Sequence, residues 1–138
     1  MKRLAVLMVV VFGLVACGGE KDKEEAAAEQ ACGPKPAATK TVHPKLPAKF
    51  PTPKGVLYTE SKKTGPSTVV SGYRNGGVES AYDAYKSAFP SAGYDVTKDE
   101  REEVDAEVNF SGGGSTGQVK LLQTCRGRTN VTITIRPA

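Results

Sequence analysis

The sequence predicts an α+β domain in which an antiparallel sheet of about four to six strands carries one helix on one face. Three observations lead to this prediction. Several short stretches alternate apolar and polar residues, as half-buried strands do, and a single stretch has the spacing of an amphipathic helix. Short glycine-containing connections separate most of the strands, and such connections favour hairpins and antiparallel pairing. The expected order is therefore β-β-α-β-β-β.

The strands are predicted from period-two alternation and from the turns that bound it. The clearest alternation runs through Val104, Ala106, Val108 and Phe110, with polar residues between them. The other strands are bounded by Gly, Pro or Asn, which favour turns. The expected strands cover residues 56–61, 68–73, 94–97, 104–110, 119–125 and 131–135.

A helix is predicted between the second and third strands, because its apolar residues recur at i, i+3, i+4, i+7, i+10 and i+11. Pro90 and Gly93 are expected to end it. Since we expect only this helix to cover the sheet, its tyrosines should pack in the core. The apolar stripe consists of Val78, Ala81, Tyr82, Tyr85, Ala88 and Phe89.

Composition divides the chain into three parts. Residues 1–16 are predicted to be a signal peptide, residues 17–45 a disordered spacer that begins with Cys17, and residues 46–138 the small α+β domain. The spacer mixes charged residues with repeated prolines, and such segments stay extended and solvated. Its sequence supports no packed element beyond two helical turns at residues 24–31.

The first residues have the features of an export signal. Lys2 and Arg3 precede an apolar run of thirteen residues, 4–16. As a helix this run would be about 20 Å long, which is short of the ~30 Å hydrocarbon core of a bilayer. A signal peptide therefore explains the run better than a membrane-spanning helix does.

The apolar run ends in a motif that resembles the lipobox of bacterial lipoproteins, Leu14-Val15-Ala16-Cys17. The resemblance implies cleavage just before Cys17, a diacylglycerol on its sulfur and frequent acylation of its new amino group. Two or more acyl chains bind a membrane stably, whereas one binds it marginally. The alternative is a secreted protein whose cysteine pairs elsewhere.

The resemblance to a lipobox also implies a location for the exported chain. Gly18 follows Cys17 at a position where lipoproteins retained at the inner membrane tend to carry aspartate, and this favours the outer membrane. The expected location is the periplasmic side of the outer membrane or the cell surface. The membrane, bound through Cys17, is therefore the first expected partner.

The folded part, residues 46–138, also resembles a small domain that recurs in bacterial envelope lipoproteins. In that domain an F-P-x-P-x-G entry precedes a hairpin, a helix with a tyrosine-containing stripe follows, and a Gly-Tyr pair leads into the next strand. The matching features here are residues 50–55, Tyr82 and Tyr85, and residues 93–94. The resemblance implies a fold rather than an activity, because most such domains have no known activity.

Charge and composition exclude several classes of function. Removal of Lys2 and Arg3 leaves 17 of the 19 basic residues against 15 acidic ones, so the net charge falls from +4 to +2. This near balance, without a basic block interleaved with aromatics, argues against a nucleic-acid partner. The single histidine, His43, lies in the predicted spacer, which excludes a histidine metal site and a Ser-His-Asp triad. We expect no metal and no cofactor.

Two cysteines remain once Cys17 is assigned to the lipid. An even number of cysteines in an oxidising compartment favours a disulfide between Cys32 and Cys125, which would attach part of the spacer to the sheet. The alternative is two free thiols, with Cys125 buried and Cys32 exposed. No C-x-x-C motif indicates a redox role.

Three other groups of residues are candidate sites, and each has a simpler explanation. The acidic segment 99–107 lacks the D-x-D-x-D-G spacing of a calcium loop, so a solvated turn and strand edge is favoured. The glycine-rich segment 112–117 precedes a strand rather than a helix, which argues against phosphate binding. Arg126 and Arg128 flank a turn and could contact anionic envelope polymers or lipid headgroups, although an exposed turn also explains them.

From these observations we expect a membrane-anchored envelope lipoprotein that acts as a non-enzymatic binding or structural module. Its partner would be a protein or an envelope polymer that contacts the open face of the sheet. The alternative is a small envelope hydrolase or metal-dependent protein that uses carboxylates of residues 99–107, among them Glu100, Glu102 and Glu103.

Overall fold

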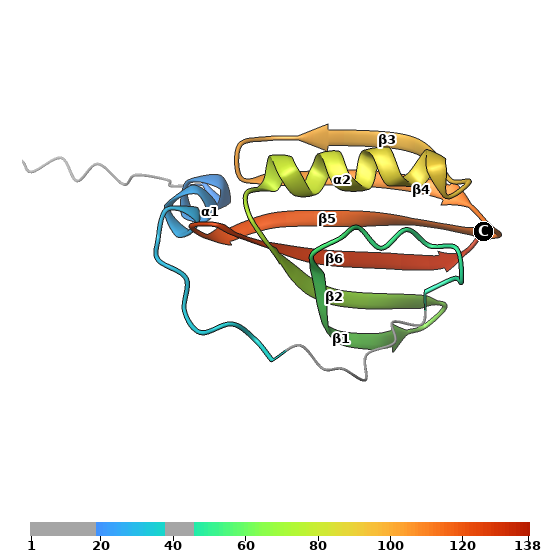
Figure 1. Cartoon of the computed structure of the whole chain (residues 1–138), viewed down its shortest axis with the longest axis horizontal. Helices are drawn as coiled ribbons and strands as arrows, with labels where there is room; N and C mark the ends of the chain where they lie inside the picture. Colours follow the sequence, from blue (N-terminus) through green and yellow to red (C-terminus); the bar gives the residue numbers. More distant parts are fainter. Residues whose placement is uncertain (1–18, 38–45) are drawn as a thin grey trace, which may run out of the picture.

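The computed structural model describes residues 19–37 and 46–138. Within these residues the chain forms one antiparallel sheet of six strands, with one helix packed on it and a second helix near one end (Figure 1). This confirms the predicted α+β class and the predicted order of elements in the domain, β-β-α-β-β-β. In chain order the elements are α1 (Glu20–Ala28), β1 (Val56–Thr64), β2 (Ser67–Asn75), α2 (Val78–Ser91), β3 (Asp95–Arg101), β4 (Asp105–Gly112), β5 (Ser115–Cys125) and β6 (Arg128–Pro137).

The strands lie in the order β1-β2-β6-β5-β4-β3, and all neighbours are antiparallel. Hairpins join every consecutive pair of strands except β2 and β3. These two strands lie in opposite halves of the sheet, and α2 connects them across one face (Figure 1). The β3–β4 and β5–β6 turns lie at one end of the sheet, which we call the tether end because α1 lies beside it. The β1–β2 and β4–β5 turns lie at the opposite end, which we call the far end.

The core lies between α2 and the face of the sheet that it covers. The apolar stripe of the helix faces this core as predicted: all its members are buried except Ala88, which is half-buried. Phe89 stacks on Phe110 with ring centroids 4.7 Å apart, and Phe50 and Tyr94 meet Phe89 edge-on at 5.5 and 5.9 Å. Aromatic pairs in these geometries contribute about 0.5–1.5 kcal/mol each beyond the area that they bury.

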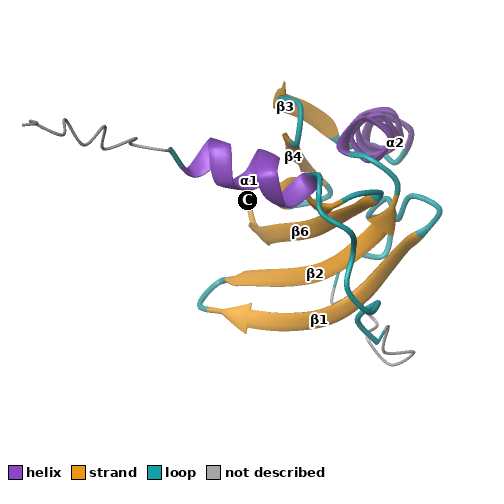
Figure 2. Ribbon diagram, turned by 90° about the vertical axis from the view of Figure 1, so that its left-hand side faces the viewer, coloured by secondary structure: helices purple, strands orange, loops and turns teal. Residues whose placement is uncertain are grey.

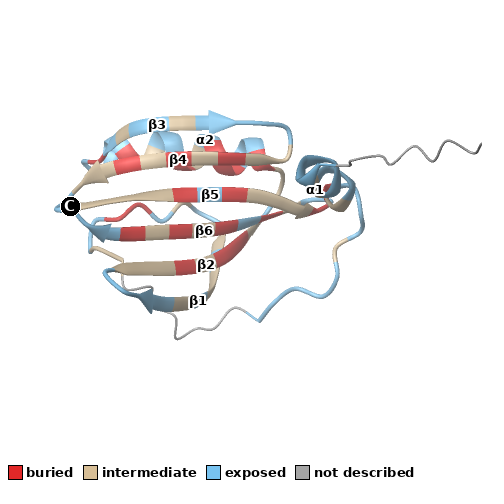
Figure 3. Ribbon diagram, turned by 180° about the vertical axis from the view of Figure 1, so that it is seen from behind, coloured by how far each residue is buried: buried red, intermediate tan, exposed pale blue. Residues whose placement is uncertain are grey.

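The two faces of the sheet differ. The entry segment, residues 46–55, lies on the same side of the sheet as α2 (Figures 1 and 2), and its Phe50 is buried in the core. On the opposite side, which we call the open face, no described element lies across the middle of the strands (Figure 3). Antiparallel sheets commonly have one packed face and one solvated face.

The end of α2 differs in detail from the expectation, because the helix includes Pro90 and continues to Ser91. It ends in a Schellman motif: the Tyr94 main-chain N–H donates to the Phe89 carbonyl at 3.0 Å, and the Gly93 N–H donates to the Pro90 carbonyl at 3.1 Å. Gly93 adopts φ 83°, which favours glycine. The Gly-Tyr pair therefore turns the chain into β3 while Tyr94 packs on Phe89.

Two strand boundaries also differ from the expectation. β3 extends to Arg101 rather than residue 97, because its polar residues continue the ladder with β4 from Asp99↔Val108 to Arg101↔Ala106. The glycine-rich segment forms a tight hairpin, since β4 runs to Gly112 rather than residue 110 and β5 starts at Ser115 rather than residue 119. Cross-strand pairing therefore overrides the polar and glycine-rich composition of these two stretches.

Candidate functional site

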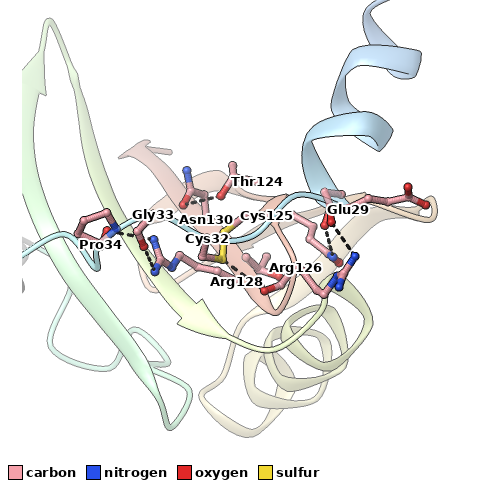
Figure 4. Close-up of a disulfide and its surroundings, with 12 residues drawn as sticks. Glu29, Cys32, Gly33, Pro34, Thr124, Cys125, Arg126, Arg128 and Asn130 are labelled. Carbon is pink, nitrogen blue, oxygen red and sulfur yellow. Dashed lines mark hydrogen bonds between the residues drawn. A yellow bond between two sulfur atoms is a disulfide. The ribbon is translucent and has the colours of Figure 1, made fainter.

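A disulfide joins Cys32 to Cys125 at the end of β5, and this confirms the predicted pairing. The two Cα atoms lie 5.0 Å apart, within the usual range for disulfides. Cys125 is buried, and the bond lies where residues 28–36 pass the β5–β6 turn (Figure 4). Part of the segment that we expected to be a spacer is therefore attached covalently to the sheet.

Arg126, in the β5–β6 turn, contacts the chain on the N-terminal side of the disulfide. Its main-chain N–H donates to the Gln30 carbonyl at 2.7 Å, and its Nη2 donates to the Glu29 carbonyl at 3.0 Å (Figure 4). On β5, Gln123 Nε2 donates to the Ala28 carbonyl at 3.3 Å. The carbonyls of Ala28, Glu29 and Gln30, at the C-terminal end of α1, thus accept hydrogen bonds from the domain. Carbonyls at this end of a helix have no partner within the helix itself.

Arg128, the first residue of β6, contacts the chain on the other side of the disulfide. Its Nη2 donates to the Gly33 carbonyl at 2.9 Å and its Nη1 to the Pro34 carbonyl at 3.3 Å (Figure 4). The Arg128 guanidinium also lies 5.7 Å from the ring centroid of Tyr73, within the range of a cation–π contact. The Tyr73 hydroxyl donates to the Pro36 carbonyl at 3.3 Å.

We call this set of residues the tether clamp: Tyr73, Gln123, Cys125, Arg126 and Arg128. Apart from the disulfide and the cation–π contact between Arg128 and Tyr73, these residues bind main-chain carbonyls of residues 28–36. Hydrogen bonds from charged donors are stronger than neutral ones. Arg126 and Arg128, which the sequence offers as candidate contacts for anionic polymers, therefore bind main-chain groups of the protein's own residues 29–34.

Helix α1 adds an exposed contact to the tether end of the sheet. Ala28 is 4% exposed, and Lys21 Nζ lies 2.6 Å from Glu102 Oε1 in the β3–β4 turn. The hydrogen bond and the charge of Glu102 raise the pKa of Lys21. Because both side chains are exposed to water, we expect the ion pair to orient α1 more than to stabilise it. The remaining expected spacer residues, 38–45 with His43, lie outside the described part of the chain, as do the predicted signal peptide, residues 1–16, and Cys17.

The open face of the sheet is largely polar. Gln118 on β5 donates to Glu107 Oε2 at 2.9 Å and to Asn109 Oδ1 at 3.4 Å, both on β4. Towards the far end, residues of β2, β4, β5 and β6 line a shallow hollow of about 320 Å³. They are Ser67, Asn109, Thr116, Gly117, Gln118, Thr134 and Arg136. Amide and hydroxyl groups on such a surface can donate hydrogen bonds to a partner and accept them from it.

The carboxylates of the acidic segment have different partners rather than one common site. Glu100 lies 3.9 Å from Lys98, Glu102 pairs with Lys21, and Glu107 accepts from Gln118. Asp99 accepts hydrogen bonds from Lys86 Nζ, at 2.8 Å, and from the Tyr82 hydroxyl.

A shallow hollow of about 440 Å³ does bring Glu102 and Glu103 near Glu79 and Arg101. Arg101 Nη1 lies 2.6 Å from Glu79 Oε1 and Lys21 pairs with Glu102, so two of the three carboxylates are already paired. Among residues 19–37 and 46–138, no group of three or more His, Cys, Asp or Glu is arranged to hold a metal ion.

The contact of Asp99 with α2 was not anticipated from the sequence. The hydrogen bonds from Lys86 and Tyr82 lower the pKa of Asp99, and the same contact with Asp99 raises the pKa of Lys86. The i, i+4 spacing of Tyr82 and Lys86 places them side by side on the helix, but nothing in the sequence identifies Asp99 as their partner. The same holds for Tyr73 and Gln123 in the tether clamp, whose partners are main-chain atoms.

Neither described helix is long and apolar enough to cross a bilayer. Comparison of the chain with protein-family models gives no match, and comparisons with curated proteins and with solved structures find no similar protein.

Proposed function

We propose that this chain is a bacterial envelope lipoprotein whose small α+β domain is a non-enzymatic binding or structural module. In this proposal Cys17 carries the lipid, and the domain lies on the periplasmic side of the outer membrane or on the cell surface. Two features support it: the lipobox at residues 14–17 and the Cys32–Cys125 disulfide, a bond that persists in oxidising compartments outside the cytoplasm.

The tether clamp is the observation that carries this proposal. Only Gly18 and Gly19 separate Cys17 from α1, and the disulfide fixes the chain 15 positions after Cys17. A free spacer of 27 residues would extend roughly 30 Å or more. The clamp instead ties the lipid attachment site to the tether end of the sheet, so that the domain stays near the bilayer with this end towards it.

The character of the open face supports a binding role. Its strands present amide, hydroxyl and charged side chains to solvent and are not covered by a described helix (Figure 3). A protein or envelope polymer can contact such a surface through hydrogen bonds without entering a deep cavity.

Mass spectrometry of the mature N-terminus tests the anchor. The proposal predicts a chain that begins at a diacylated or triacylated Cys17, and a Cys17→Ala variant that no longer partitions with membranes. An unmodified Cys17, or a cut at another position, would contradict the lipoprotein assignment.

Photo-crosslinking in cells tests the binding role. A photoreactive residue at Lys120 or Thr132 on the open face should capture one recurrent partner, whereas the same residue at Ser87, on the outer side of α2, should not. Diffuse capture of many proteins from the open-face positions would count against a specific module.

One observation favours the alternative of a small envelope hydrolase or metal-dependent protein, namely the hollow that contains Glu79, Glu102 and Glu103. We weight this alternative lower because cations already pair with Glu79 and Glu102. Calorimetric titration with Ca²⁺, Mg²⁺ and Zn²⁺ separates the two: binding that a Glu102→Gln/Glu103→Gln double variant abolishes would favour the alternative.

A further inference from the structure

The far end of the sheet carries a second hollow, of about 400 Å³, on the side opposite the tether clamp. Its apolar lining comes from the entry segment, the β1–β2 turn and the end of β6. Ile135, at the end of the core, is 5% exposed, whereas Pro66 and Pro137 are exposed at the rim. The apolar residues are Leu46, Pro47, Pro66, Ile135 and Pro137.

Two cations line the same hollow, Lys63 of β1 and Arg136 of β6, and both are exposed. Among the described residues, neither forms an ion pair. The surrounding segments, residues 46–50, 61–68, 111–118 and 133–137, contain four basic residues and no aspartate or glutamate. The surroundings of the hollow are therefore basic, whereas acidic side chains concentrate in α1 and in residues 95–107. Asp95 also lies at the far end, opposite Ser111, but on β3, at the other edge of the sheet from Lys63.

We propose that this hollow binds a short acidic peptide segment of a partner protein, which places an apolar side chain between Lys63 and Arg136. The proposal rests on the proposed binding function and names its partner class. An apolar floor flanked by cations fits a segment that combines an aliphatic or aromatic side chain with carboxylates. A purely anionic polymer would leave the apolar lining without a partner.

The neighbouring hollow on the open face supports a peptide, because Arg136 lines both hollows. A chain that leaves the apolar hollow past Arg136 meets Asn109, Gln118 and Thr134, whose amide and hydroxyl groups can bond peptide N–H and C=O groups. Together the two hollows can thus contact an apolar side chain, carboxylates and main-chain groups of one extended peptide.

The position of the hollow also suits a partner away from the membrane. β5 has 11 residues and runs from the far end to the tether clamp, which corresponds to about 35 Å at the usual rise per residue. In the proposed orientation the tether end lies towards the bilayer, and the far end is then presented to proteins of the surrounding compartment.

Selection from a displayed library of random dodecapeptides, with the full-length chain purified in detergent as bait, tests the proposal. We expect enriched peptides to share at least two carboxylates next to an aliphatic or aromatic residue. A Lys63→Glu/Arg136→Glu double variant should weaken their binding by about tenfold or more, since two charge-assisted contacts are lost. Lys23→Glu is the matched control, because it reverses an exposed cation of α1 at the tether end, away from both hollows and the open face, and should leave binding within about twofold.

Changes in the peptide keep the test decisive even if a protein variant folds poorly. Replacing the carboxylates by amides, or the apolar residue by serine, should each abolish measurable binding to the unaltered protein in fluorescence anisotropy. Peptides without acidic residues, no enrichment at all, or binding that the Lys63→Glu/Arg136→Glu variant leaves unchanged would overturn the proposal. Binding of a Cys17→Ala chain to anionic phosphatidylglycerol vesicles that the same double variant abolishes would assign the surface to lipid instead.

These outcomes are separate from those of the proposed function. A lipidated Cys17 and a recurrent open-face crosslink would remain valid if the peptide selection failed. Conversely, peptide binding at the far end would persist if Cys17 proved to be unmodified.

Discussion

Tyr82, Lys86 and Asp99 connect the edge strand β3 to α2. Lys86 Nζ lies 2.8 Å from Asp99 Oδ2 and 2.9 Å from the Tyr82 hydroxyl, and the Arg101 guanidinium lies 5.6 Å from the Tyr82 ring centroid. Exposed ion pairs contribute little by themselves. Here, however, the buried ring of Tyr82 gives the charged groups a fixed partner, so we expect the network to define how β3 packs against the helix.

Asp99 should make the domain sensitive to acid. Its pKa is lowered in the folded state by the hydrogen bonds from Lys86 and Tyr82, so its stabilisation is present above the unfolded pKa of about 4 and is lost as the pH falls further. Asp99→Asn should therefore reduce the loss of stability between about pH 4 and pH 2, measured by urea unfolding. Asp95→Asn, which removes an exposed carboxylate of the same strand, is the control. An unchanged pH profile for Asp99→Asn would contradict this role.

Tyr85 should make the domain sensitive to alkali. It is fully buried, and burial together with the neighbouring Tyr58 raises its pKa well above the usual value of about 10. The folded state therefore retains a proton that the unfolded state releases, and stability should fall as the pH rises above about 10. In Tyr85→Phe this fall should be smaller. The difference in unfolding free energy between the two proteins should be constant from about pH 7 to 9, and a constant difference up to pH 11 would refute the prediction.

At the level of elements, the hairpins depend on close contacts that tolerate no side chain. Gly117 on β5 lies opposite Phe110 of β4, and a Cβ atom there would lie 2.1 Å from the Thr134 carbonyl oxygen and 2.8 Å from the Phe110 ring. The Phe110 ring thus occupies the space that a side chain at position 117 would need. This contact couples β4, β5 and β6 at the centre of the sheet.

Gly117→Ala should destabilise the domain by about 1–3 kcal/mol, because the new methyl group forces backbone and ring apart. Chemical unfolding followed by circular dichroism measures the effect. Gly33→Ala is the control, since a Cβ atom at that position meets nothing within 4 Å. Equal stability of the two variants would show that the sheet adjusts at Gly117 without cost.

The edge strands carry features that oppose pairing with another sheet. The register of β1 shifts between Tyr58 and Glu60, and that of β3 shifts between Val96 and Lys98. Bulges and charged side chains, such as Lys62 and Lys63 on β1, protect exposed edges against aggregation. The partner binding that we propose therefore concerns the open face and the far end, and does not involve pairing of a further strand along β1 or β3.

For the molecule as a whole, the tether clamp decides how the N-terminal segment relates to the domain. The disulfide joins residues 93 positions apart, and hydrogen bonds on both sides of it extend the contact from Ala28 to Pro36. A cross-link of this span restricts the unfolded chain strongly. We therefore expect the clamp to affect both the stability of the domain and its distance from the proposed lipid anchor at Cys17.

A Cys32→Ser/Cys125→Ser variant should lose about 2–5 kcal/mol of unfolding free energy. Hydrogen exchange at residues 28–36 should also become faster, since only the hydrogen bonds remain. Cys17→Ser, which removes the third cysteine and leaves the disulfide intact, should change neither quantity. If the double variant kept full stability and slow exchange, the hydrogen bonds of Arg126 and Arg128 alone would account for the clamp.

The local patterns of the sequence were sufficient for the elements and their class. Alternation and the helical stripe predicted all six strands and α2, because side-chain burial follows the periods of strand and helix directly. The cysteine count predicted the pairing of Cys32 with Cys125, since the expected lipidation of Cys17 leaves two cysteines. Boundaries failed where cross-strand pairing outweighed composition, as at the end of β3.

The tether clamp and the two hollows could not be predicted in the same way. Arg126 and Arg128 appeared as an exposed pair in a turn, and their partners proved to be main-chain carbonyls, which every residue has and which leave no trace in a sequence. The hollow at the far end combines Leu46, Pro66 and Arg136, which only the order β1-β2-β6 brings together. Periodicity reports which side of an element is buried, whereas contacts between distant segments depend on strand order and register, and those arise from the packing of the whole sheet.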